Sequence, residues 1–147
     1  SKSEGKYKGV MLYETEESDV PVYDVTFDAD SSDISQNTEK LEDFCRENKV
    51  RADIAMFTAI AAEEMSVIIK ETGKINKCDS IDMLVKIYKE DIILDLRSIG
   101  KPFDPSAYAK EQGSSLDTLL KIASSVDFSY IMGMNQTRIT LKKNKEK

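Results

Sequence analysis

The segment "IDMLVKIYKEDIILDLR", residues 81–97, decides the fold. Its first half carries apolar residues at alternate positions, which is the period of a β-strand with one buried face. The four alternating residues are Ile81, Met83, Val85 and Ile87. The polar residues "KED" then turn the chain, and residues 92–97 form a return strand. The segment therefore predicts a β-hairpin.

The residues before this hairpin predict one strand and two helices. Residues 22–27 alternate as a strand does, and "DADSSD", residues 28–33, ends that strand and offers N-cap side chains for a helix. The helix is indicated by apolar or small residues at three- and four-residue spacing, namely Ile34, Thr38, Leu41, Phe44 and Cys45. Arg51 to Thr72 carries the longest helical pattern, and Gly73 is the expected stop.

The residues after the hairpin predict a short helix, an amphipathic helix and a second hairpin. "PSAYAKEQGSS", residues 105–115, indicates a short helix followed by a flexible connection. The amphipathic helix carries Leu116, Leu119, Leu120 and Ala123. The second hairpin has strands at residues 128–132 and 138–142 around "GMNQT". The predicted fold is an α/β (α+β) two-layer sandwich, with a mixed, mostly antiparallel sheet and helices packed on one face.

Composition limits the class of protein. The chain has 147 residues, which fits one domain at residues 22–142, after a partly flexible leader at 1–21 with room for one short strand and before a charged tail at 143–147. Because 21 basic residues are scattered among 27 acidic ones, nucleic acid is not an expected partner. No run of about 18 apolar residues exists, so direct membrane insertion is not expected. The Ser1 start suggests a piece excised from a longer protein.

The cysteine and histidine content argues against several kinds of chemistry. The chain has no histidine, and its two cysteines, Cys45 and Cys78, are far apart in sequence. This usage predicts a reducing compartment, and it excludes a histidine-dependent triad and argues against a zinc site. No metal ligand set is expected.

A carboxylate on the longest helix is the first candidate for chemistry. Glu64, in "AAEEM", is spaced so that helical geometry places it within the apolar stripe, beside Ile60 and Ile68. An ionised carboxylate in a core costs at least several kcal/mol, which a partner or a function must offset. The alternative is that the stripe is narrow and Glu64 lies at its edge, beside solvated Glu63.

Two loops are the other candidates. In "GKPFDP", residues 100–105, the glycine could let a flat ligand approach the backbone, with prolines stiffening the rim. Alternatively this loop is a plain turn from sheet to helix, with Asp104 as the helix cap. "EQGSSLDTLLKIA", residues 111–123, could hold phosphate on backbone amides at a helix start, or could be only a flexible linker.

Four features follow one another along the chain: "AAEEM" on a long helix, an amphipathic hairpin, "GKPFDP", and a final strand near "MGMNQTRITL". This order resembles the GHKL (histidine-kinase-type) ATPase domain. The nearest branch is the anti-sigma-factor serine-kinase-like modules of bacteria, including those appended to larger membrane proteins. The resemblance covers about residues 22–142 and implies a Bergerat-type ATP-binding fold. It implies that Glu64 matches the catalytic base. The nucleotide-pocket loop would comprise Gly100, Lys101, Pro102, Phe103 and Asp104.

The chain departs from the family pattern at three places. Where the family carries an asparagine that holds Mg²⁺, four residues after the glutamate, this chain has Ile68, which offers no ligand oxygen. Where the family places an aspartate that binds adenine, ungapped counting puts Ser98, and a lost charge-assisted hydrogen bond weakens binding by ~1.5–3 kcal/mol. The second glycine-rich box is replaced by "SSLDTL", where Asp117 would repel a triphosphate.

These departures predict a degenerate ATP-binding domain with a regulatory or protein-interaction role in a bacterial protein. No cofactor is expected, and the partner would be another protein or a domain of the parent protein. The location would be the cytoplasm, either free or as the cytosolic domain of a larger membrane protein. The alternatives are an active but weak anti-sigma-type serine kinase or ATPase that uses Mg-ATP and Glu64, and a pocket for a different small ligand. The resemblance also implies that Ile68 and Ser98 lie across one pocket with a wet lip.

Overall fold

The computed structural model describes residues 19–76, 80–111 and 117–144, and the side chains of residues 73–76, 109–110, 117–118 and 120 are outside that description. Most of the leader predicted at residues 1–21, with its short strand, and the end of the predicted tail lie outside the described residues. The elements are β1 (Val22–Asp28), α2 (Ser31–Glu47), α3 (Ala52–Asn76), β2 (Ser80–Ile87), β3 (Asp91–Ile99), α4 (Pro105–Glu111), α5 (Asp117–Ile122), β4 (Ser125–Ile131) and β5 (Met134–Lys142).

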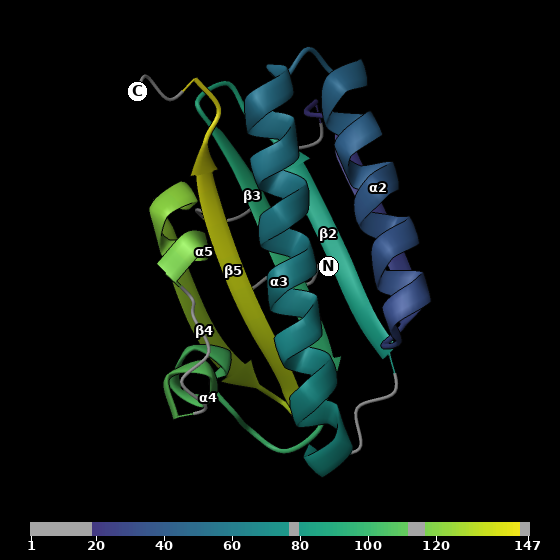
Figure 1. Cartoon of the computed structure of the whole chain (residues 1–147), viewed down its shortest axis with the longest axis vertical. Helices are drawn as coiled ribbons and strands as arrows, with labels where there is room; N and C mark the ends of the chain where they lie inside the picture. Colours follow the sequence, from purple (N-terminus) through teal and green to yellow (C-terminus); the bar gives the residue numbers. More distant parts are fainter. Residues whose placement is uncertain (1–18, 77–79, 112–116, 145–147) are drawn as a thin grey trace.

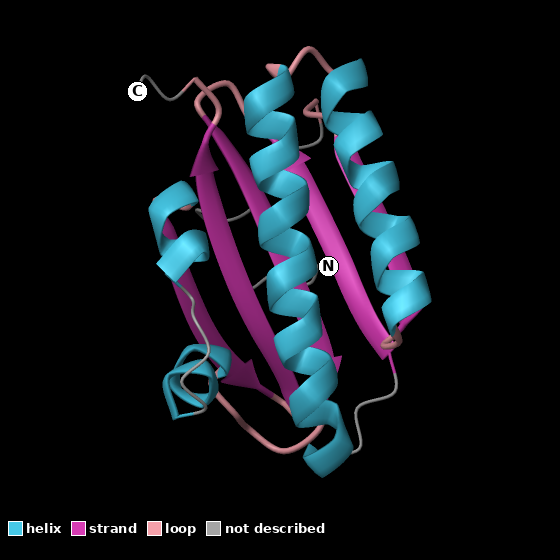
Figure 2. Cartoon of the chain, viewed as in Figure 1, coloured by secondary structure: helices cyan, strands magenta, loops and turns pink. Residues whose placement is uncertain are grey.

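The chain folds into two layers. Five strands form one sheet in the order β1-β2-β3-β5-β4. The helices lie on one face of this sheet, with α2 and α3 side by side across it (Figures 1 and 2). Every neighbouring pair of strands in the described sheet is antiparallel. The prediction of a mixed sheet, with some parallel pairing, is therefore wrong on this point. The predicted α+β sandwich with helices on one face is confirmed.

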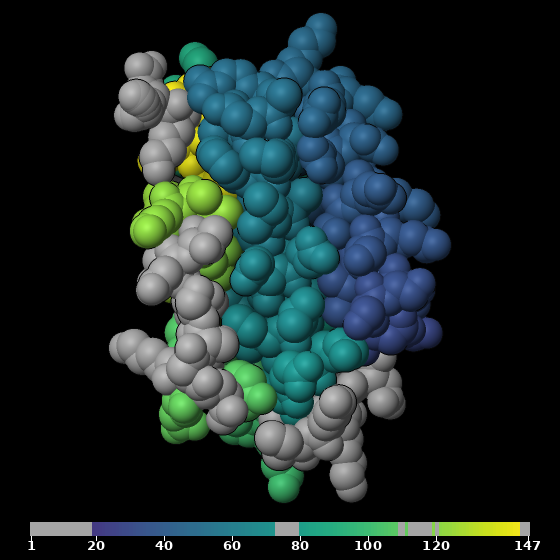
Figure 3. Space-filling model, viewed as in Figure 1, coloured from purple at the N-terminus to yellow at the C-terminus, as the bar shows by residue number. Residues whose placement is uncertain are grey.

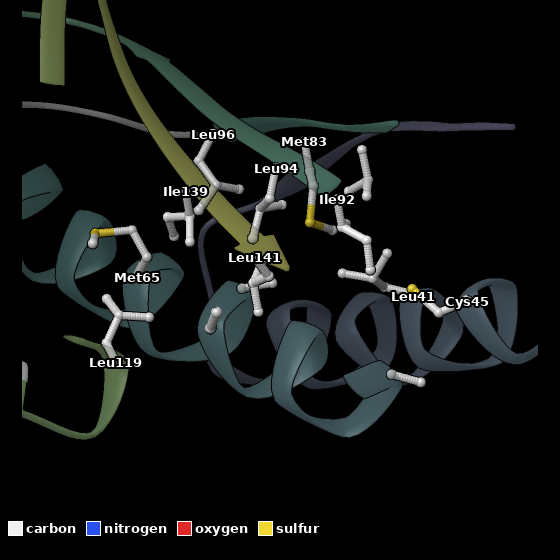
Figure 4. Close-up of a cluster of buried hydrophobic side chains, with 14 of the residues drawn as sticks. Leu41, Cys45, Met65, Met83, Ile92, Leu94, Leu96, Leu119, Ile139 and Leu141 are labelled. Atoms are coloured by element: carbon white, nitrogen blue, oxygen red, sulfur yellow. The ribbon is translucent and has the colours of Figure 1, made fainter. Parts of the chain in front are cut away.

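The predicted hairpin is the middle of this sheet. Its β2 strand alternates buried and half-buried residues along its length, and the residue pairs Met83↔Leu96 and Val85↔Leu94 face the helices. β3 continues the same alternation, with its even-numbered positions buried, except that Asp95 on the other face is buried as well. Figure 4 shows side chains of the sheet, such as Leu94, pointing toward the helices that carry Met65 and Cys45. Burial of this apolar face, at roughly 25 cal/mol per Å², is the main stabilising term.

The start of α2 follows the predicted capping. Asp30 has an extended backbone conformation, and its carboxylate oxygen Oδ1 accepts a hydrogen bond of 3.0 Å from the amide of Asp33. This bond satisfies one of the free amides that every helix start presents. The helix then buries Leu41 and Cys45 completely, as their spacing predicted. Lys49, in the turn to α3, adopts a positive φ of 68°.

The end of α3 differs from the expectation. Gly73 was the expected stop, but the helix continues through it to Asn76. One glycine inside a helix costs about 1 kcal/mol relative to alanine, which is less than the cost of leaving the next backbone groups without helical partners. Ile68 of the predicted stripe is buried, together with Met65, whereas Ile60 is only half-buried. No helix in the described part of the chain is both long enough and apolar enough to cross a membrane.

The second hairpin turns earlier than expected. Its turn is Met132-Gly133, with φ values of 52° and 81°, and β5 already begins at Met134. The residues "GMNQT" are therefore mostly strand and not loop. Two successive positive φ values are those of a tight hairpin turn, which matches the right-handed twist of the strands. Met132 is 98% exposed at the tip.

Candidate functional site

The loop after β3 is held by one buried amide side chain. Asn135, on β5 and only 3% exposed, lies directly across from Ser98 in the strand register. Its Nδ2 donates to the carbonyl oxygen of Lys101 at 3.0 Å. Its Oδ1 accepts from the backbone amide of Phe103 at 3.1 Å. A single side chain therefore fixes two backbone groups of the loop.

The tip of the second hairpin closes the other side of this loop. The amide of Gly100 donates to the carbonyl of Gly133 at 3.2 Å, and the Tyr130 hydroxyl donates to the carbonyl of Gly100 at 3.0 Å. The ring of Phe103 lies 6.5 Å from that of Phe128 on β4, measured between centroids. The β4–β5 hairpin therefore holds the loop both through hydrogen bonds and through an aromatic contact.

The loop also has the simple role of starting a helix. The Oδ1 of Asp104 accepts a hydrogen bond of 2.9 Å from the amide of Ser106, and Pro105 is the first residue of α4. This is the capping arrangement that the turn interpretation predicted, because proline needs no amide partner at a helix start. Lys101 and Pro102 are exposed on the loop surface. That the same loop borders a nucleotide pocket stays a prediction.

Glu64 lies at the edge of the apolar stripe and not inside it. Its side chain is exposed, as is that of Glu63, while Ala61 and Met65 on the same helix are fully buried. The alternative of a narrow stripe is therefore correct, and no burial cost has to be offset.

Ile68 and Ser98 lie on the same side of the sheet. Ile68 belongs to the buried core under α3, and Ser98 follows Leu94 and Leu96 at alternate positions of β3, whose side chains face the helices. The expected wet lip is wrong, because Ile68 is only 9% exposed and Ser98 only 4%. Both side chains are buried, so a charged or amide side chain at either position would need new partners.

The third candidate falls largely outside the described residues. Residues 112–116 of the glycine-serine connection, including Leu116, are not described. Asp117 begins α5, but its side chain is outside the description, so its predicted repulsion of a triphosphate remains a prediction. Cys78 is also outside, whereas Cys45 is a free, buried thiol.

Sequence reasoning missed an ion pair on the uncovered face of the sheet. The guanidinium of Arg138 donates two hydrogen bonds to the carboxylate of Asp95, of 2.8 Å and 2.9 Å. The side chain of Asp95 is 7% exposed and that of Arg138 is 49% exposed. The two residues are far apart in sequence and become neighbours only through the β3–β5 pairing, so the sequence carries no local signal for them.

One group of carboxylates in the described residues is close enough to suit a cation. Single oxygen atoms of Asp28, Asp30 and Asp33 lie within 4.8 Å of one another. Asp30 already accepts the capping hydrogen bond of α2, which explains why acidic residues gather at this helix start. The cluster is therefore accounted for by helix capping.

Comparison with known proteins assigns no family to the chain. No protein-family model matches the sequence, and no curated protein matches it either. The function is therefore inferred from the residues alone.

Proposed function

We propose that this domain is a degenerate member of the histidine-kinase-type ATPases that has lost Mg-ATP binding and serves a regulatory or protein-interaction role. The proposed setting is a bacterial protein in the cytoplasm, or the cytosolic part of a larger membrane protein. Its partner would be another protein or a domain of the same parent chain. The proposal rests on the sequence resemblance together with the positions of a few side chains.

The observation that carries the proposal is the burial of Ile68. By the resemblance, this position should present an amide oxygen to Mg²⁺. Here a hydrocarbon side chain fills it and is 9% exposed, as part of the apolar core. Mg²⁺ requires oxygen ligands in a nearly ideal octahedron and gains nothing from methyl groups. The metal that would bridge the phosphates therefore loses a protein ligand.

The arrangement of the layers supports the family resemblance. The resemblance requires helices on one face of the sheet, with Ile68 and Ser98 on the same side, and the chain meets both conditions. The glycine-proline loop that follows β3 is also held in place by two hydrogen bonds from Asn135 of β5. Such a loop, together with a hydrocarbon side chain at the expected metal-ligand position, is what we expect if nucleotide binding was lost and the fold was kept.

Titration calorimetry of Mg-ATP into the purified domain tests the proposal. We expect no heat of binding at about 1 mM nucleotide, a concentration that corresponds to a binding free energy of roughly −4 kcal/mol. The same titration with EDTA separates binding of the nucleotide alone from binding that depends on the metal. A micromolar, magnesium-dependent site would refute the proposal.

A substitution at Glu64 separates the proposal from the active alternative. In an anti-sigma-type kinase or ATPase, the exposed Glu64 carboxylate would act as the base, so Glu64→Gln should abolish phosphate transfer or release. In a degenerate domain the substitution should change neither stability nor interactions, because the side chain is exposed. Phosphate release that persists in Glu64→Gln would remove Glu64 from the catalytic role.

A further inference from the structure

The outer surface of the helix layer carries a hollow between α2 and α3. It has a volume of about 280 Å³, and its lining includes Met56, Ala59 and Ile60 of α3. The two helices lie side by side on the face shown in Figure 3. The residues that line the hollow come from both of them. Met56 is 43% exposed although its side chain is apolar. The hollow is thus open to solvent, and its lining combines these apolar side chains of α3 with Ser35 and Thr38 of α2.

Carboxylates surround this floor. Glu39 and Glu42 contribute from α2, and Glu63 contributes from α3. Glu42 forms an ion pair with Arg46 of the same helix, at a distance of 2.8 Å. Neither Glu39 nor Glu63 has an ion pair or hydrogen bond with another described residue, and both are exposed. One carboxylate on each helix therefore lines the hollow without an ion pair to any other described residue.

A row of outward-facing residues, apolar except for Glu63, continues along α3 beyond the hollow. Residues three, four and seven apart share one face of a helix, and Met56, Ile60, Glu63 and Val67 follow this spacing. Val67 is 41% exposed. At 1.5 Å per residue, the row from Met56 to Val67 is about 16 Å long. That length corresponds to about three helical turns of a ligand that packs along the seam.

We propose that the seam between α2 and α3 binds a cationic amphipathic helix of a partner protein. The apolar side chains of that helix would pack on Met56, Ile60 and Val67. Its lysine or arginine side chains would pair with Glu39 and Glu63, whose charges have no other described partner. The net charge of −6 on the chain would speed the approach of such a partner.

This inference goes beyond the proposed function and does not depend on it. The seam lies on the solvent side of the helix layer, whereas Ser98 and the loop after β3 lie at the end of the sheet. Loss or retention of Mg-ATP binding would leave the carboxylates and the apolar side chains of the seam unchanged. A failure of one proposal therefore says nothing against the other.

The test uses a labelled helical peptide of leucine and lysine, about 14 residues long, with leucines spaced three and four residues apart. A matched peptide carries glutamate at every lysine position. We expect the lysine peptide to bind in fluorescence anisotropy at physiological salt with a Kd below about 100 μM, and the glutamate peptide not to bind. Amide chemical shifts in a labelled domain should change at residues 35–42 and 56–67.

Paired substitutions locate the contact. The double substitution Glu39→Gln with Glu63→Gln should raise the Kd for the lysine peptide by about fivefold, since each exposed charge pair contributes modestly to binding. The matched control, Glu47→Gln with Glu90→Gln, removes two exposed charges away from the seam and should leave Kd within about twofold. The proposal is overturned by any of three results: no binding of the lysine peptide, equal weakening by the control pair, or shift changes confined to other elements.

Discussion

Replacing Asn135 by alanine should release the loop after β3. The amide makes two neutral hydrogen bonds, to Lys101 and Phe103, and is only 3% exposed. Each such bond contributes about 1 kcal/mol, so the loss should be about 2 kcal/mol. The loss should not exceed this value, because Lys101 is exposed and water can hydrogen-bond its carbonyl oxygen in place of Asn135. For a chain of this length, the loss lowers Tm by roughly 4–8 °C.

Urea denaturation measures the loss, and amide hydrogen exchange locates it. In Asn135→Ala, the Phe103 amide should exchange much faster, while the β3–β5 amides keep their protection. Asn135→Asp keeps an acceptor for Phe103 and should keep that amide protected, although it loses the bond to Lys101. The control is Gln136→Ala, whose side chain lies on the opposite face of β5. A change below about 0.5 kcal/mol in Asn135→Ala, with unchanged exchange at Phe103, would refute this account of the loop.

Three further outcomes are expected. Burial, aided by the Glu42 carboxylate, raises the pKa of the Cys45 thiol from 9.0 to about 12. The folded pKa is higher than the unfolded one, so the stability present below pH 9 should be lost as the pH rises toward 12. In urea denaturation, Cys45→Ala should lose less stability over this pH range than the unsubstituted chain does. Met132→Asn should stabilise the hairpin by roughly 0.5–1 kcal/mol in thermal denaturation, because asparagine tolerates a positive φ. Ile68→Asn should lower the urea unfolding free energy by about 3 kcal/mol, because it buries an amide in the core.

The fold could be predicted because its information is local and periodic. The alternation at Ile81 and Met83 and the three- and four-residue spacing around Leu41 each appear within one element, and both patterns predict which face is buried. Element ends were less predictable. A glycine at 73 is a weak stop, and the helix extends past it because the cost of one glycine is small.

The candidate site could be predicted only in part. The cap at Asp104 follows from adjacent residues, and the structure has it. The bonds from Asn135 to the loop, in contrast, join residues that the β3–β5 pairing brings together. Nothing in the sequence indicated them, because Asn135 was expected in the turn "GMNQT" and lies in β5 instead. The exposure of Glu64 depended on the width of a stripe, which spacing alone does not give.

The strand order has a consequence for how the chain folds. The β2–β3 hairpin closes locally, since Ile87 pairs with Ile92 across a short turn. Its two outer neighbours arrive from distant parts of the chain, because Val22 pairs with Lys86 and Asp91 with Lys142. Such pairings cost loop-closure entropy before any contact compensates for it. The central hairpin can therefore act as a template, to which β1 and the β4–β5 hairpin are added from opposite sides, more slowly than the helices of a bundle of equal length would assemble.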